Sequence, residues 1–125
     1  MIRTVIADDN GDLRLLLSLA LRRDDRFEVV ATAADGEEAI DLIAAHEPDL
    51  LLLDLAMPKK DGYEVLADVG TTGCPVVVVL SGFSAEEVVD RALELGAAGF
   101  LLKGTDLKTV CDQLAEIYQR AVTPG

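Results

Sequence analysis

The chain has 125 residues, enough for one domain with a sizeable hydrophobic core. Half of its residues are hydrophobic and its mean hydropathy is +0.30, which excludes an intrinsically disordered chain. The formal net charge of -12 argues against direct binding of nucleic acid or of an anionic membrane, because both would repel the protein. Cationic partners and divalent metal ions fit this charge better.

The expected cellular setting follows from three features of the sequence. The apolar runs are far shorter than the roughly 20 residues that a membrane span requires. No signal peptide precedes Ile2, and Cys74 and Cys111 lack the spacing of metal ligands. We therefore expect a cytoplasmic protein with reduced thiols and no transmembrane segment.

Runs of β-branched residues or leucine alternate five times with segments of helical periodicity. Strands are expected at residues 3–7, 27–33, 49–54, 76–80 and 98–102. Three of these runs are apolar on both faces, which is typical of strands covered by helices on both sides.

The segments that follow the strands carry helix signals. After the first strand, one apolar stripe at helical spacing comprises Leu13, Leu16, Leu17, Ala20 and Leu21. The next start signals are two pairs with capping-box spacing, Asp35 with Glu38 and Ser84 with Glu87. Pro48 follows the expected end of the second helix, and Asp61 with Gly62 forms a turn before the third. A last stripe comprises Leu107, Val110, Cys111, Leu114, Ile117 and Tyr118. Alternating β and α elements with right-handed crossovers predict an α/β fold, a parallel sheet between two helix layers.

Polar residues gather where the predicted strands end. Asp8 and Asp9 follow the first strand, and Asp54 ends the third. Ser81 follows the fourth strand and Lys103 the fifth. Taken singly, each has an ordinary explanation: a helix N-cap region, a turn serine and a solvated surface lysine. Together, at the sheet edge where open α/β proteins bind ligands, they indicate a functional site.

The residue types at this edge suggest phosphoryl chemistry with a metal ion. Neighbouring carboxylates repel each other unless a proton or a cation neutralises them. Mg²⁺ is commonly held by one or two carboxylates together with a phosphate oxygen. With Mg²⁺ bound, Asp54 could attack a phosphoryl group, Ser81 could donate a hydrogen bond to it, and Lys103 could place a positive charge beside it.

Four ordered motifs carry a family resemblance: "IADDN" at residues 6–10, "LLLDLAMPKKDG" at 51–62, "VVLSGF" at 78–83 and "GFLLKG" at 99–104. Over its whole length, residues 1–125, the chain resembles one receiver domain of bacterial two-component response regulators. Near the fifth strand, "GFLLKG" resembles the receivers of NarL/LuxR-type regulators. The resemblance implies a flavodoxin-like (βα)5 three-layer sandwich whose five-stranded parallel sheet has the order 2-1-3-4-5.

Carried over by position, the resemblance implies that Asp54 accepts the phosphoryl group. Asp9, Asp54 and the backbone carbonyl of Ala56 would bind Mg²⁺, with Asp8 acting largely through bound water. Ser81 and Phe100 would be the switch residues, and Lys103 the lysine of the site. Two positions depart from the common pattern: Gly104 replaces a proline that often follows the lysine, and Phe100 replaces a tyrosine.

The resemblance also implies partners and an output. The phosphoryl donor would be a histidine kinase or a phosphotransfer protein, the changed surface could bind a partner or form a homodimer, and catalysis would be limited to the domain's own phosphorylation and dephosphorylation. A free-standing receiver and the receiver part of a transcriptional regulator both remain open.

Two other functions remain open. One is a constitutive dimerisation or interaction module that is not phosphorylated. The other is a phosphatase of the haloacid-dehalogenase type, although Ala56 occupies the place where that family carries a second acid.

Overall fold

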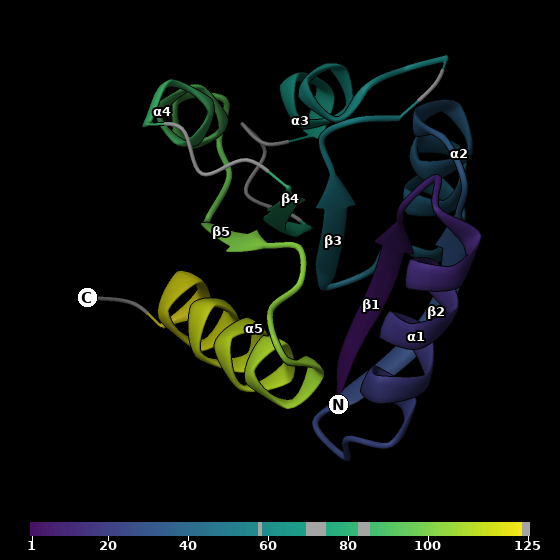
Figure 1. Ribbon diagram of the computed structural model, residues 1–125. Helices are drawn as coiled ribbons and strands as arrows, with labels where there is room; N and C mark the ends of the chain where they lie inside the picture. Colours follow the sequence, from purple (N-terminus) through teal and green to yellow (C-terminus); the bar gives the residue numbers. More distant parts are fainter. Residues whose placement is uncertain (58, 70–74, 83–85, 124–125) are drawn as a thin grey trace.

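The computed structural model describes residues 1–57, 59–69, 75–82 and 86–123, and these form a five-stranded parallel sheet with helices on both faces (Figure 1). The strands are β1 (Ile2–Ala7), β2 (Phe27–Ala33), β3 (Leu50–Asp54), β4 (Val76–Ser81) and β5 (Gly99–Leu102). The helices are α1 (Gly11–Arg22), α2 (Gly36–His46), α3 (Gly62–Val69), α4 (Glu86–Glu94) and α5 (Leu107–Val122). The strand order β2-β1-β3-β4-β5 confirms the predicted fold.

Strand alternation divides the core into two halves. In β3, Leu50 and Leu52 belong to the cluster that packs against α1 and α5. Leu51 and Leu53 belong to the cluster that packs against α2, α3 and α4. Because successive side chains of a strand point to opposite faces, a continuous leucine run is what a strand between two helix layers requires. All four leucines are buried.

Polar side chains start four of the helices. Asn10, Asp35 and Asp106 are the N-cap residues of α1, α2 and α5, and each accepts a hydrogen bond from a backbone N–H of the first turn. Asp61 and Glu64 form a reciprocal pair at the start of α3, in which each side chain accepts from the other residue's backbone N–H. The predicted cap at Ser84 lies outside the described residues.

The predicted core stripe of α1 is wrong at one position. Leu17 and Leu21 are buried, and Leu13 and Ala20 pack against the core. Leu16, in contrast, is 51% exposed. It lies about 100° around the helix from Leu17, and the buried stripe of this helix is too narrow to include it.

Cys111, on α5, is buried and free, and burial raises the pKa of its thiol. Cys74 lies outside the described residues. Within the described ranges, every helix is too short or too polar to cross a membrane.

Candidate functional site

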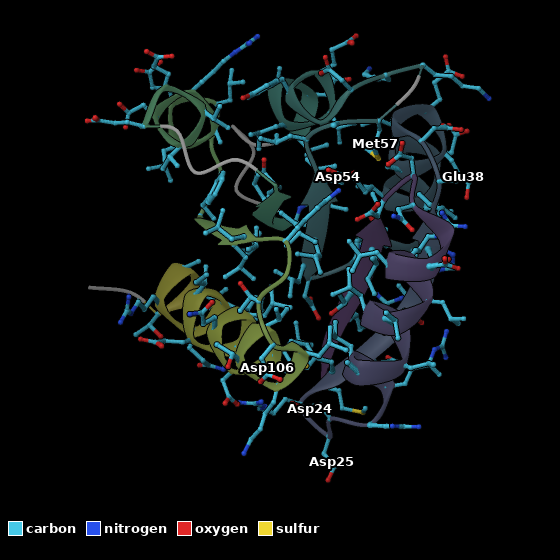
Figure 2. All side chains as sticks on the ribbon, in the orientation of Figure 1. Asp24, Asp25, Glu38, Asp54, Met57 and Asp106 are labelled. Carbon is cyan, nitrogen blue, oxygen red and sulfur yellow. The ribbon has the colours of Figure 1, made fainter. Side chains whose placement is uncertain are left out.

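The carboxyl ends of β1, β3, β4 and β5 bring the predicted site residues to one edge of the sheet. Asp8, Asp9 and Asp54 each offer a carboxylate oxygen, and these oxygens lie within 4.8 Å of one another. Asp8 and Asp54 are buried, whereas Asp9 is exposed. Figure 2 shows Asp54 at the end of β3, far from Asp24 and Asp25 in the loop between α1 and β2.

The turn after β1 fixes the orientation of Asp8. Its Oδ1 accepts a hydrogen bond from the backbone N–H of Asn10 at 2.9 Å. Its carbonyl accepts a hydrogen bond from Arg14 Nη1 at 2.7 Å. Asn10 then caps α1 through its own side chain. The start of the helix therefore holds the Asp8 carboxyl group in place, with Oδ2 left for another partner.

Asp54 is held by the buried leucines before it and by the loop after it. Its Oδ1 accepts a hydrogen bond from the backbone N–H of Ala56 at 3.1 Å. Gly62, which begins α3, approaches so closely that a Cβ atom there would lie 2.4 Å from the carbonyl oxygen of Asp54. Only a residue without a side chain allows this contact, so α3 starts against the backbone of Asp54.

Lys103 supplies the positive charge of the site from the end of β5. Its Nζ lies 3.1 Å from Asp54 Oδ2 and 3.8 Å from Asp8 Oδ2. Its backbone N–H donates a hydrogen bond to the carbonyl of Ser81 at 2.8 Å. Gly104 follows with φ +89°, a left-handed conformation that proline cannot adopt. The glycine at this departure from the family pattern therefore has a conformational reason.

Burial dominates the electrostatics of Asp54. The pKa of its carboxyl group is raised from 3.8 to about 6, first because burial disfavours the charged form. The hydrogen bond from Ala56 lowers this pKa, the charge of Asp8 raises it, and Lys103 lowers it. The one positive charge of Lys103 therefore does not offset the cost of burying the charged carboxylates of Asp8 and Asp54.

Two buried carboxylate oxygens show whether the residues of this site fit a metal ion. Asp8 Oδ2 and Asp54 Oδ2 are inaccessible to solvent and have no hydrogen-bond donor among the described residues, although Lys103 faces both as an ion-pair partner. Buried polar atoms normally have a partner. Carboxylate oxygens are the donors that hard divalent cations prefer, and exposed Asp9 leaves room for ligating water. The residues present therefore fit Mg²⁺.

The remaining predicted residues surround this cluster. Ser81 is the last residue of β4 and is buried. Phe100 is half-buried, packs against the core cluster on the α2–α4 side, and pairs with Val79 across the strands. Strand alternation places Ser81 on the same sheet face as Val79, and so on the face of Phe100. Ala56 is exposed.

Three contacts around the site were not foreseen from the sequence. One is the hydrogen bond from Arg14 to the carbonyl of Asp8. The others are close backbone approaches: Gly62 against Asp54, and Gly36 against Lys60, where a Cβ atom would lie 1.9 Å from the Lys60 carbonyl oxygen. The Asp61-Gly62 dipeptide signals a turn, but only the tertiary structure shows what lies against it.

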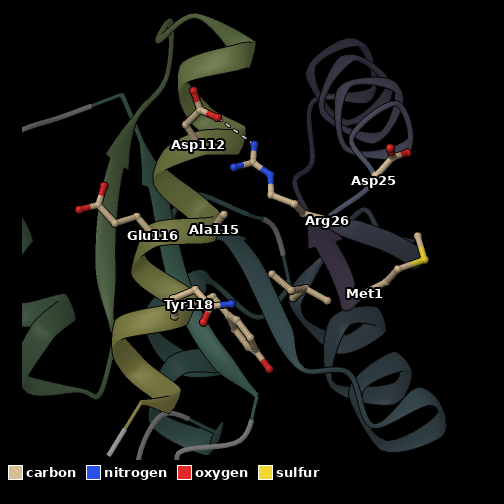
Figure 3. Close-up of a pocket in the computed structure, with 9 residues that line it drawn as sticks. Met1, Asp25, Arg26, Asp112, Ala115, Glu116 and Tyr118 are labelled. Atoms are coloured by element: carbon tan, nitrogen blue, oxygen red, sulfur yellow. Dashed lines mark hydrogen bonds and ion pairs between the residues drawn. The ribbon is translucent and has the colours of Figure 1, made fainter. Parts of the chain in front are cut away.

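A cavity of about 660 Å³ lies away from this site (Figure 3). It is lined by residues of the N-terminus, of the loop before β2 and of α5: Met1, Ile2, Asp25, Arg26, Asp112, Ala115, Glu116, Tyr118 and Gln119. Arg26 crosses beside it and donates a hydrogen bond to Asp112 at 2.8 Å. None of the site residues lines this cavity.

Comparison with known proteins agrees with the geometry. The family model of the response regulator receiver domain matches residues 4–115. The transcriptional regulatory protein PdtaR of Mycobacterium tuberculosis is 37% identical over 101 residues, which are 81% of this chain and 49% of PdtaR. The chain therefore spans about half the length of this curated relative.

Solved structures of similar fold include a signal receiver domain and a complex of CheY. The signal receiver domain of the response regulator NarL from Mycobacterium tuberculosis has a TM-score of 0.88 and 36% identity, covering 94% of this chain and 96% of that one. The CheX-CheY-BeF3-Mg²⁺ complex from Borrelia burgdorferi has a TM-score of 0.87 and 28% identity, covering 94% of this chain and 89% of that one.

Proposed function

Because the chain belongs to the response regulator receiver domain family, we propose that it is a phosphorylation-controlled switch with Asp54 as the phosphoryl acceptor. One observation carries this proposal. Asp54 is a buried carboxyl group whose Oδ2 has no hydrogen-bond donor within the described part of the chain, set beside a second such oxygen of Asp8 and beside Lys103. The family is a signalling family of two-component systems, and its relatives include transcriptional regulators.

Asp9, Asp54 and the Ala56 carbonyl would hold Mg²⁺ directly, and Asp8 would hold it through water. When bound, the ion supplies positive charge to the carboxylates and to the phosphoryl oxygens. What supports this assignment is the cluster of carboxylate oxygens within 4.8 Å of one another, two of which are buried and have only Lys103 as an ion-pair partner among the described residues. The complex of CheY named above, which includes Mg²⁺, belongs to a protein of similar fold.

In the phosphoryl transfer, a carboxylate oxygen of Asp54 attacks the phosphorus of the donor. An O–P bond forms, the donor's P–N bond breaks when the donor is a phosphohistidine, and the released imidazole nitrogen takes a proton from water. Lys103 Nζ, 3.1 Å from Asp54 Oδ2, stabilises the charge on the phosphoryl oxygens. The proposed biological donor is a histidine kinase or a phosphotransfer protein.

The switch follows from the residues beside Asp54. A phosphoryl group adds negative charge and hydrogen-bond acceptors at the end of β3, and the Ser81 hydroxyl at the end of β4 is the donor proposed to move toward it. Phe100 lies on the same face of the sheet and would follow. The surface of α4, β5 and α5 would then shift between two packings.

We place this switch in the cytoplasm as the receiver part, residues 1–125, of a transcriptional regulator. The net charge of -12 leaves contact with nucleic acid to a different part of such a regulator. Catalysis by this chain is then limited to phosphorylation and dephosphorylation of itself.

The test is intact mass after incubation with acetyl phosphate, with Mg²⁺ or with a chelator. Wild type should gain one phosphoryl group only with Mg²⁺, and Asp54→Asn should gain none. Asp61→Asn is the matched control, since Asp61 caps α3 outside the oxygen cluster, and it should behave as wild type. Absence of any mass gain in wild type with Mg²⁺ would favour a constitutive interaction module instead.

A further inference from the structure

Helix α1 exposes a group of leucines on its outer side. Leu15 is 58% exposed, Leu16 is 51% exposed and Leu19 is 42% exposed. Figure 1 shows this helix on the outside of the sheet, beside β1 and β2. Single exposed leucines are normal on a protein surface, but a contiguous group marks an interaction surface. We call this surface the α1 leucine face.

The α1 leucine face has the spacing of a coiled-coil seam. Asp12, Leu16, Leu19 and Arg23 follow one another at intervals of four, three and four residues, as a and d positions do in a heptad repeat. Leu15 lies one helical turn before Leu19 and widens the stripe. The four positions span about 16 Å along the helix axis.

The charges at the two ends of this face are complementary to each other. Asp12 lies in the first turn of α1 and Arg23 is its C-cap residue. Neither side chain forms an ion pair with any residue that the structure describes. The other two arginines of the helix are occupied otherwise, since Arg14 binds the Asp8 carbonyl and Arg22 binds the Ser18 hydroxyl.

A second copy of the same helix, laid antiparallel, gives each of these four heptad positions a complementary partner. A twofold axis midway between residues 17 and 18 places Leu16 against Leu19 of the second copy. The same axis places Asp12 against Arg23 of the second copy, and each contact occurs twice. Antiparallel helix dipoles add a favourable contribution. An anionic membrane or nucleic acid fits poorly, because Asp12 lies on the face and would repel it.

From this self-complementary order we propose that the chain forms a homodimer through antiparallel pairing of α1 with α1 of a second copy. The dimer does not depend on phosphorylation, since no residue of the face belongs to the site. One 12-residue helix covers less than the about 800 Å² per partner of a standard interface, so the dimer is weak and depends on concentration.

The test is sedimentation velocity from micromolar to millimolar protein concentration. Leu16→Gln should raise the dimer dissociation constant at least about tenfold, because the lost contact occurs twice. Leu93→Gln is the matched control: this leucine of α4 is 47% exposed and lies outside the face, so the dissociation constant should stay unchanged.

Charge reversal tests the antiparallel register. Asp12→Arg and Arg23→Asp should each weaken the homodimer by about threefold to tenfold, because each places like charges together twice. An equimolar mixture of the two variants should form a heterodimer as tight as the wild-type dimer, since both contacts are again of opposite charge.

A wild type that stays monomeric at millimolar concentration would overturn the proposal. So would a dimer unaffected by Leu16→Gln, or a mixture of the charge variants that shows no recovery. Because all these measurements use unphosphorylated protein, their failure leaves the proposed phosphorylation of Asp54 untouched.

Discussion

At the scale of single residues, Asp54 contributes to the stability of the metal-free protein in a way that changes with pH. Its pKa is 3.8 in an unfolded chain and about 6 in the folded protein. Between these values the folded state binds more protons than the unfolded state, so the free energy of unfolding falls as pH rises. Above about pH 6 the protein carries the full cost of the buried charge.

We therefore expect Asp54→Asn to stabilise the metal-free protein. At pH 7.5 the gain in the free energy of unfolding should be about 1–3 kcal/mol, and near pH 4 it should largely vanish. Urea unfolding in the presence of a chelator at both pH values measures this difference. A gain of equal size at both, or a loss, would show that burial of the charge is not what the substitution relieves.

Substitution of Gly62 tests whether α3 must lie in close contact with the backbone of Asp54. Gly62→Ala places a Cβ atom 2.4 Å from the Asp54 carbonyl oxygen, so the free energy of unfolding should fall by about 1–3 kcal/mol. Gly11→Ala is the control, since its Cβ atom would meet only the end of the Arg14 side chain at 3.7 Å. Thermal unfolding compares the two, and equal stability of both variants would contradict the close approach.

At the scale of elements, substitutions at two helix caps distinguish an effect on stability from an effect on Mg²⁺ binding. Asn10 caps α1 and its backbone N–H also holds Asp8, whereas Asp106 caps α5 through Thr109. Asn10→Ala and Asp106→Ala should each cost about 1 kcal/mol, which lowers the Tm of a domain of this size by about 4 °C.

Only Asn10→Ala should also weaken Mg²⁺ binding, because loosening the start of α1 loosens the turn that orients Asp8. Calorimetric titration with Mg²⁺ distinguishes the two variants. An equal loss of Mg²⁺ affinity in both would mean that the first turn of α1 has no special role in the site.

The elements also show which features can be read from the sequence. Apolar runs predicted all five strands, and helical periodicity with capping signals predicted the helices between them. The positions of the strand ends predicted that the site residues lie at one edge of the sheet. The boundaries shifted slightly: β3 begins at Leu50, one residue after the expected start. Leu16 was misassigned because periodicity gives the direction of a stripe, while its width depends on the neighbouring elements.

Tertiary contacts could not be predicted from the sequence, for a different reason. Asp8 and Asp9 are adjacent and chemically alike, yet one is buried and the other exposed. The approach of Gly62 to Asp54 joins two elements across a loop. Local sequence patterns do not contain information on distances between elements. The residue types of the site could therefore be predicted from the sequence, whereas the burial of each side chain could not.

At the scale of the whole molecule, the protein carries a net charge of -12, and three of its carboxylates cluster where the metal ion is proposed to bind. Mg²⁺ should therefore stabilise the folded protein, by about 2.7 kcal/mol at a concentration one hundred times its dissociation constant. Asp9→Asn should reduce this gain, and a chelator should abolish it. Thermal unfolding with NaCl at matched ionic strength is the control, and an equal rise in Tm with NaCl alone would point to general screening.

The central claim is that Asp54 becomes an acyl phosphate, and borohydride trapping followed by peptide mass mapping tests it most directly. Reduction of an acyl phosphate converts the aspartate into homoserine, which marks the residue that carried the phosphoryl group. After treatment with acetyl phosphate and Mg²⁺, we expect homoserine at position 54 alone, and none when Mg²⁺ is withheld. Homoserine at Asp8 or Asp9, or its absence in protein that has gained a phosphoryl group, would contradict the account.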